Sequence, residues 1–376
     1  MLALAAAVLA VLLFTWVGYP AVVALLASLR RPAPAVRAAD AAEAPRVSVV
    51  VASADGADDI RARVANLVET DHPAGRLEVI VALDAVNGRA RPAELEGIDG
   101  RLRVVVGDQP GGKASTLNAG ARAATGDVLV LTDTHQRFDP RSIPELVRAL
   151  GADPRLAAVS GALAVSGGRR PRTPGEWYWH FERKLRADEA RLHSVVGVTG
   201  AIYAMRRPLW APLPAGLILD DLYVPMRLVL AGHRVGFSEE ARAVDGRTFD
   251  ARQEFRRKVR TLTGNVQLVA WLPGVLLPWR NPIWLQFLCH KLLRLLTPYL
   301  ALVLVAAVGW WAVSSLWRLG GWAGLAAACA LPALALLHPG LRRKVVRQAE
   351  WVVLMQAAAM LAMANGVRGR WTVWQR

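Results

Sequence analysis

Apolar and polar positions divide the chain into an apolar N-terminal run, a central part of alternating short runs, and an apolar C-terminal third. In the central part, apolar runs of about six residues predict buried strands, and the stretches between them have helical periodicity. Such alternation predicts an α/β fold with a mostly parallel sheet and helices on both faces. The predicted strands are 47–52, 78–83, 102–106 and 127–132, and the predicted helices are 58–69, 114–124, 141–150 and 222–231.

The first 29 residues are apolar and carry no charge. This exceeds the roughly 20 residues that span a bilayer, so they predict a transmembrane anchor. A cleaved signal peptide is the alternative, but a basic start is missing and the run exceeds the usual apolar core of about 7–15 residues. Arg30 and Arg31 follow at once, which predicts a cytoplasmic location for the next domain.

The C-terminal third predicts further membrane segments. Residues 271–291 are rich in Trp and Pro, which is typical of a membrane interface, and three apolar spans follow. A multi-pass protein of the cell (plasma) membrane is therefore expected. The predicted division is an anchor (1–29), a linker (30–46), a cytoplasmic catalytic domain (47–270), an interfacial segment (271–291), a membrane domain (292–367, with spans 292–316, 322–337 and 351–366) and a tail (368–376).

Composition favours a lipid partner over nucleic acid. The formal net charge is +16, and the chain has 14 Trp together with long apolar runs. An anionic membrane surface accounts for this combination, and no nucleic-acid-binding motif is present in the sequence. The two cysteines, Cys289 and Cys329, lie in apolar stretches and are predicted to be buried small side chains.

The chemistry centres on residues 111–140. Gly111, Gly112 and Lys113 form a predicted turn that carries a cation and opens a helix, an arrangement suited to a diphosphate. The following strand ends at Asp133-Thr134-His135, where a carboxylate and an imidazole could face one metal ion. A plain turn and a helix N-cap are the ordinary alternatives for these residues. In an open parallel sheet, ligands bind at the carboxyl ends of the strands.

Residues 111–140 as a whole resemble the donor-binding core of inverting glycosyltransferase family 2, which has a GT-A fold. The resemblance lies in the order of GGKASTLNAG, the strand 127–132, DTH and FDP. The resemblance covers about residues 47–264 and is closest to membrane-anchored bacterial members such as the cellulose, hyaluronan and poly-N-acetylglucosamine synthases. His135 stands where that family has a second Asp. The resemblance implies a nucleotide-sugar donor, with UDP expected, and Mn²⁺ or Mg²⁺ held by Asp133 and His135; an imidazole ligand favours Mn²⁺.

The same resemblance implies roles for other strand ends and for the helix after them. Donor contacts are expected from Ser53, Asp55, Asp84, Gly112, Lys113, Asp133 and Arg260, and acceptor-side contacts from Thr199, Gly200 and Asp220. Asp221 takes the place of the catalytic base, which must accept the proton of the attacking hydroxyl. A turn-forming role for Asp84 and helix capping by Asp220 and Asp221 are the alternatives.

Three further segments bear on the acceptor side and on whether the enzyme is processive. Residues 171–191 predict a helix with Trp and Arg residues, lying near the acceptor or membrane or else packing an aromatic stripe in the core. Residues 195–205 predict a strand containing two glycines, and 250–270 predict a basic amphipathic helix. Processive relatives have Gln-x-x-Arg-Trp in that helix, whereas here only Arg260 is retained, which argues against a polymerising synthase with a glycan channel.

The enzyme expected is therefore a hexosyltransferase that acts on a glycan or lipid acceptor at the bilayer. A non-catalytic membrane scaffold is the rival from another class, and the altered metal motif is its best support.

Overall fold

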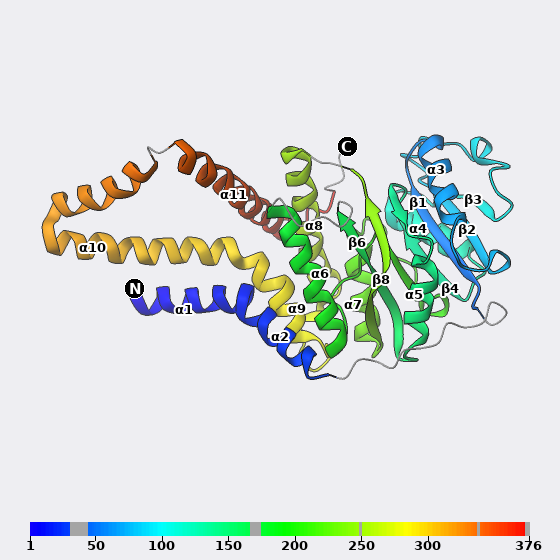
Figure 1. Cartoon of the computed structure of the whole chain (residues 1–376), viewed down its shortest axis with the longest axis horizontal. Helices are drawn as coiled ribbons and strands as arrows, with labels where there is room; N and C mark the ends of the chain where they lie inside the picture. Colours follow the sequence, from blue (N-terminus) through cyan, green and yellow to red (C-terminus); the bar gives the residue numbers. More distant parts are fainter. Residues whose placement is uncertain (31–43, 166–173, 248–249, 337–338, 373–376) are drawn as a thin grey trace. The chain divides into compact units, whose positions relative to one another are not determined.

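The computed structural model describes residues 1–30, 44–165, 174–247, 250–336 and 339–372 (Figure 1). It divides into two compact units. The larger contains residues 22–248 and 267–287, and the smaller contains residues 1–21, 249–266 and 288–376. The predicted linker falls mostly on residues 31–43 and the end of the predicted tail on 373–376, which lie outside the described residues.

The larger unit is built on one eight-stranded sheet with the order β3-β2-β1-β4-β7-β6-β8-β5. Strands β1 to β4 are parallel to one another; β7 runs antiparallel to both β4 and β6, and β6 pairs with β8 in parallel. The strands are β1 (Val47–Ser53), β2 (Leu77–Leu83), β3 (Leu102–Val106), β4 (Val128–Thr132), β5 (Gln136–Phe138), β6 (Leu156–Val165), β7 (Tyr203–Arg206) and β8 (Arg234–Asp245).

The apolar alternation of β1 explains why helices cover both faces of the sheet. Val47, Val49 and Val51 lie in one buried cluster with the apolar faces of α3 (Ala57–Val68) and α5 (Ser142–Gly151). Val50 points to the opposite face, towards α4 (Lys113–Ala123). A Cβ at Gly120 of α4 would lie 2.5 Å from Val50 Cγ1, so only glycine permits this close helix–strand packing.

The remaining helices follow the sequence pattern with small differences. The unit also contains α6 (Pro174–Leu192), α7 (Asp220–Leu230) and α9 (Trp284–Phe287), while α8 (Ala251–Trp271) extends from one unit into the other. The predicted strands and helices of the parallel half are confirmed to within about two residues, within the accuracy of element boundaries.

The prediction of a strand over 195–205 is wrong for its first eight residues. Only Tyr203–Arg206 forms a strand, and the preceding residues form turns and bends. The reason lies in backbone hydrogen bonding, because the amide of Val198 donates to the carbonyl of Asp221 in α7 (2.8 Å) rather than to a neighbouring strand. We call residues 197–201 the glycine loop.

The smaller unit is helical and apolar. It contains α1 (Leu2–Leu13), the π-helical turn Phe14–Gly18, α10 (Leu293–Leu336) and α11 (Pro339–Val367). Trp16 Nε1 donates to Thr297 Oγ1 (3.1 Å). The buried Cys289 agrees with its predicted packing role.

Two helical segments among the described residues are long and apolar enough to cross a bilayer, namely Leu2–Ser28 and Trp284–Ser315, and Val352–Val367 is a shorter apolar helix. The predicted anchor and first C-terminal span coincide with the two long segments. Residue 337 lies outside the described residues, so the predicted span 322–337 stays a prediction; the backbone of α10 is non-helical at Gly321, which has φ +53°.

Candidate active site

The carboxyl ends of β1, β2 and β4 meet at one edge of the sheet. Ser53 pairs with Leu83 in register, and Val51 pairs with Thr132. The residues that end or follow these strands therefore come together, as the sequence predicts for a parallel sheet. They are Ser53, Asp55, Asp84 and Asp133.

Asp84 holds the turn in front of α4. Its Oδ1 accepts the amide hydrogens of Val86 (2.9 Å) and Asn87 (2.8 Å), and its Oδ2 accepts that of Gly112 (2.7 Å). Burial raises the pKa of the Asp84 carboxyl, but these hydrogen bonds outweigh it and leave the pKa below its usual range. The structure thus gives Asp84 the turn-forming role, and contact with the nucleoside stays a prediction.

The two glycines of this turn have φ of +83° (Gly111) and +86° (Gly112), a region that favours glycine. Gly112 occupies the N-cap position of α4, and Lys113 is the first residue of the helix. The first amides of α4 can donate hydrogen bonds to an anion, as the predicted diphosphate-binding site requires. The turn also directs the lysine side chain back towards the strand ends.

Lys113 connects two acidic segments that lie far apart in the sequence. Its Nζ lies 3.0 Å from Asp133 Oδ1 and 3.2 Å from Asp220 Oδ1. Burial lowers the pKa of Lys113, but Asp133, Asp220 and Asp221 together raise it well above the ordinary value. The ammonium is therefore charged at neutral pH and binds the end of β4 to the start of α7.

Asp221 lies against the glycine loop. A Cβ on Gly200 would lie 3.2 Å from Asp221 Oδ2, so a larger residue there would crowd the carboxylate. Asp220 and Asp221 are the first two residues of α7, and Leu219 occupies the N-cap position. The N-cap interpretation of the acidic pair is therefore wrong: Asp220 binds Lys113 instead, and both carboxylates lie at the positive end of the helix dipole.

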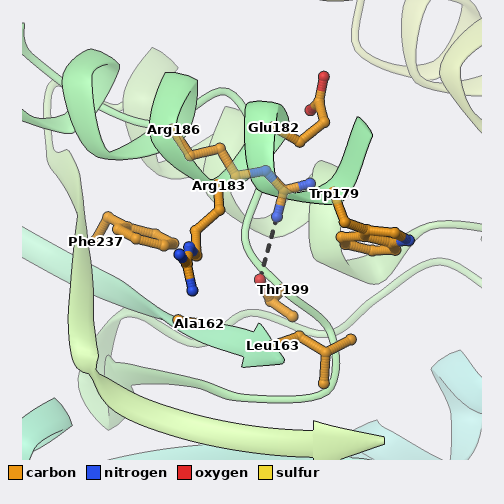
Figure 2. Close-up of a pocket in the computed structure, with 8 residues that line it drawn as sticks. All are labelled: Ala162, Leu163, Trp179, Glu182, Arg183, Arg186, Thr199 and Phe237. Atoms are coloured by element: carbon orange, nitrogen blue, oxygen red, sulfur yellow. Dashed lines mark hydrogen bonds between the residues drawn. The ribbon is translucent and has the colours of Figure 1, made fainter. Parts of the chain in front are cut away.

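Thr199 of the glycine loop faces α6. Its Oγ1 accepts a hydrogen bond from Arg186 Nη1 (3.1 Å; Figure 2), and its amide donates to Ser160 Oγ (2.9 Å). Thr199 is 8% exposed, so these bonds fix the loop between β6 and α6. The predicted acceptor-side residues Thr199, Gly200 and Asp220 are thus brought to the same region as Asp221.

His135 contacts a carboxylate of the first strand end rather than Asp133. Its Nε2 lies 3.3 Å from Asp55 Oδ2, and Arg89 Nη2 lies 3.1 Å from Asp55 Oδ1. Ser53 Oγ accepts hydrogen bonds from Thr134 Oγ1 (2.9 Å) and from the Asp55 amide (3.0 Å). Burial raises the pKa of the Asp55 carboxyl, but His135, Thr134 and Arg89 outweigh it and lower the pKa overall.

Within the described residues, no three His, Cys, Asp or Glu side chains are grouped so that they could hold a metal ion by themselves. Asp133 is 38% exposed and His135 is 32% exposed, so both can be reached from solvent. Mg²⁺-type sites in nucleotide enzymes commonly use one or two carboxylates, with substrate phosphates as the remaining ligands. The side chains present fit a site of that kind, in which a donor diphosphate would supply the other ligands.

Two buried polar residues of this site carry no motif in the sequence. The hydroxyl of Tyr203, which is fully buried on β7, has no hydrogen-bond partner in the described part of the chain. Burial raises the pKa of Tyr203, and Asp220, Asp221 and Asp133 raise it further. Tyr203 therefore stays protonated beside the acidic cluster and offers a donor there.

Arg63 of α3 is the second. Its Nη2 donates to Thr132 Oγ1 (2.7 Å), and Thr132 Oγ1 in turn donates to the carbonyl of Ala201 (2.6 Å). The guanidinium also lies 4.3 Å from the ring centre of Phe138. Burial and then Arg137 lower the pKa of Arg63 to about 9, against the opposing effect of Asp133. This chain of bonds links the end of β4 to the glycine loop.

Arg260 lies on α8 in the smaller unit, and its predicted contact with the donor stays a prediction.

Comparisons with known proteins bear on the family and on the fold. Residues 48–211 match the family described as "Glycosyl transferase family 2". The chain is 23% identical over 238 residues to the "Probable glycosyltransferase YdaM" of Bacillus subtilis (strain 168), covering 60% of this chain and 57% of that protein. The chain thus spans little more than half the length of that curated relative.

Among solved structures, the chain resembles the mannosyltransferase PcManGT from Pyrobaculum calidifontis, determined in complex with GDP-Man and Mn²⁺. The TM-score is 0.69, with 24% sequence identity, and the match covers 97% of this chain and 99% of the other. This likeness confirms the predicted GT-A-type fold. The match of residues 48–211 to the family 2 description supports the family predicted from the motifs.

Proposed function

We infer that this protein, with its family 2 domain, is a glycosyltransferase that moves a sugar from a nucleotide-diphosphate donor to a hydroxyl acceptor with inversion. The observation that supports this best is the position of Lys113. It lies between Asp133 at the end of β4 and Asp220 at the start of α7, next to Asp221. One cation thus joins the predicted donor side to the predicted acceptor side.

In the proposed reaction, the acceptor oxygen bonds to the anomeric carbon while the bond from that carbon to the diphosphate oxygen breaks. Asp221 accepts the hydroxyl proton as the oxygen attacks, which is the role of a general base. Lys113 and the amides at the start of α4 face the diphosphate, where negative charge grows as it leaves. Arg260 is proposed to face the same charge.

A divalent cation, Mn²⁺ or Mg²⁺, would be held by Asp133 and His135 with diphosphate oxygens, and when bound it would neutralise charge on the leaving group. The metal in the PcManGT complex supports its inclusion here. The donor in that complex is GDP-mannose, whereas UDP is the expectation from the motifs, so both nucleotide classes belong in the test.

We place the reaction at a membrane, in polysaccharide or glycolipid synthesis, with the catalytic domain in the cytoplasm. The support is the exposure of the two long apolar segments: in the most apolar 18 residues of each, only 22% and 17% of the residues are buried. Large apolar side chains are exposed along them, including Leu9, Leu13, Leu302 and Val305. Exposed apolar area of this extent is expected to contact lipid.

The test is release of nucleotide diphosphate from a panel of UDP- and GDP-sugars by the purified full chain, with and without Mn²⁺. Metal-dependent release from at least one donor, abolished in Asp133→Ala, is the expected result. If none of the donors is turned over while the protein is folded, the scaffold alternative replaces this proposal. Product length on a gel separates single transfer from processive synthesis.

A further inference from the structure

One face of α6 carries an aromatic ring and two cations towards the glycine loop. Trp179, Arg183 and Arg186 are spaced i, i+4 and i+7, so they lie on the same side of the helix. With β6, β8 and the loop they line a small, partly open pocket (Figure 2). Its lining consists of Ala162, Leu163, Trp179, Glu182, Arg183, Arg186, Thr199 and Phe237.

The two guanidinium groups of this pocket lack a carboxylate partner among the residues that the structure describes. Arg186 donates to Thr199 Oγ1 (3.1 Å), and Arg183 Nη2 lies 3.4 Å from His180 Nδ1. Glu182 is buried, and in Figure 2 its carboxylate points away from both guanidinium groups. Elsewhere in the larger unit, arginines such as Arg89 and Arg155 have an acidic partner within 3.1 Å.

Guanidinium groups that point into a pocket and have no internal acid are suited to an anion. An arginine pairs with a phosphate or carboxylate through two parallel hydrogen bonds, and it remains charged at all working pH values. The flanking rings of Trp179 and Phe237 supply apolar faces to the same pocket. Amphipathic groups, with an apolar side and a charged end, fit such a lining.

The position of the pocket relates it to Asp221. Thr199 lines the pocket, and the next residue, Gly200, lies against the carboxylate of Asp221. A molecule anchored on Arg183 and Arg186 is therefore separated from the proposed base by about one residue of the glycine loop. The pocket and the proposed base thus lie against neighbouring residues of one loop, as expected for an acceptor site.

We propose that this pocket binds an anionic group, a phosphate or a carboxylate, carried by the sugar of the acceptor. Arg183 and Arg186 bind the anion, Trp179 contacts the sugar ring, and Thr199 holds Arg186 in place. The assignment names the acceptor class for the glycosyl transfer proposed above, and in that sense it rests on the proposed function. It predicts that neutral sugars are the poorer acceptors.

The test measures binding of three probes that share one ring: glucose, glucose 6-phosphate and glucuronate. Binding to the full chain is followed by ligand-observed NMR at low and high salt. We expect at least one anionic probe to bind about tenfold or more tightly than glucose, since charge-assisted pairs contribute on that scale. The two anionic probes distinguish a phosphate from a carboxylate site.

Variants of α6 connect that preference to the pocket. Arg183→Gln and Arg186→Gln should each remove most of the preference for the anion, and Arg186→Lys should retain part of it. Arg191→Gln is the matched control, because Arg191 is an exposed arginine of the same helix outside the pocket lining. Circular dichroism of each variant identifies any loss of folding.

The outcomes separate this inference from the donor chemistry. Affinity for UDP and GDP with Mn²⁺ is measured in the same variants and should not change. If nucleotide binds but glucose and the anionic probes bind alike, or the preference survives both Gln variants, the pocket assignment is wrong. If the anion preference is present but no nucleotide binds, the pocket stands and the proposed transfer fails.

Discussion

The two ends of the parallel strands differ in how their carboxylates are satisfied. At the amino ends, Glu78 Oε1 accepts hydrogen bonds from Ser48 Oγ, from the amide (2.7 Å) and hydroxyl (2.9 Å) of Thr125, and from the Gly126 amide (3.3 Å). At the carboxyl ends, Asp133 and Asp220 share one ammonium, that of Lys113.

The difference shows which end of the sheet is built for stability and which for binding. The donors to Glu78 are side chains and amides of β1 and of the segment before β4, so these hydrogen bonds hold β1, β2 and the start of β4 together. Around Lys113, the carboxyl end instead brings Asp133, Asp220 and Asp221 near one ammonium group, and Asp133 is 38% exposed. Such an arrangement can bind a ligand. Substitutions at the carboxyl end should therefore mainly reduce transfer or nucleotide binding, and substitutions at the amino end should mainly reduce stability.

The largest effect is expected from Asp221→Asn. Asn keeps the shape of the side chain but cannot accept a proton as a base, so transfer should fall about 10²–10⁴-fold. Affinity for the nucleotide diphosphate should change little. The measurement is transfer rate together with nucleotide affinity, and Asp71→Asn, an exposed surface aspartate, is the control. Equal transfer rates for Asp221→Asn and the control would contradict the proposed base.

Asp220→Asn should not behave like that control. Its carboxylate is 7% exposed and binds Lys113, so its removal frees the ammonium from one of its two partners. We expect weaker donor binding and a loss of stability, with the transfer rate of the saturated enzyme less affected than in Asp221→Asn. Denaturant unfolding and nucleotide titration of both variants check this order.

The next largest effect is expected from Lys113→Met. The substitution leaves Asp133 and Asp220 adjacent without a cation, and it removes the positive charge proposed to face the diphosphate. Nucleotide-diphosphate affinity should fall by about tenfold or more, since hydrogen bonds to charged groups contribute roughly 1.5–3 kcal/mol. Lys113→Arg keeps the charge and is the matched control. Calorimetric titration with UDP and GDP measures the effect, and unchanged affinity in Lys113→Met would exclude a phosphate role.

A smaller effect is expected from His135→Ala, and it would sharpen the assignment of the metal site. His135 lies 3.3 Å from Asp55, so its position is compatible both with a ligand and with a structural partner of that carboxylate. If it is a ligand, the Mn²⁺ concentration for half-maximal activity should rise, and His135→Asp should shift preference towards Mg²⁺. An Mn²⁺ titration identical to that of the parent chain would leave His135 only the contact with Asp55.

Sequence reasoning was most successful where the information is local. The apolar runs at β1, β2 and β4 and the turn residues Gly111 and Gly112 are fixed by nearby positions, so fold, strand ends and family could be predicted. The loop character of 195–202 could not be predicted, because its apolar residues are buried although they form no strand, and the amide of Val198 bonds to Asp221 of α7.

Long-range pairing was the part that the sequence could not supply. Lys113 with Asp220, and His135 with Asp55, join segments whose contact depends on the sheet order. Arg63 and Tyr203 were missed for another reason. In the sequence Arg63 looks like an ordinary polar position on a helix and Tyr203 like part of an apolar strand, whereas both are fully buried next to the end of β4. Only the packing reveals them.

The smallest effect on activity is expected at the opposite end of the strands, from Glu78→Gln. Burial raises the pKa of Glu78, but the hydrogen bonds from Ser48, Thr125 and Gly126 outweigh it and lower the pKa below the ordinary value of 4.5. Since the folded pKa is the lower one, the ionised carboxylate stabilises the fold above the ordinary pKa, and this contribution is lost as pH falls through the folded pKa. The amide cannot ionise, so the free energy of unfolding of the variant should fall by about 1 kcal/mol at pH 7 and by less near pH 3.

Glu239→Gln, at an exposed position, is the control for a simple change of charge. Urea unfolding at pH 7 and pH 3 measures both variants, and transfer per folded molecule should match the parent chain. A variant as stable as the control at pH 7, or one with impaired transfer, would contradict the division of the sheet into a stabilising end and a binding end.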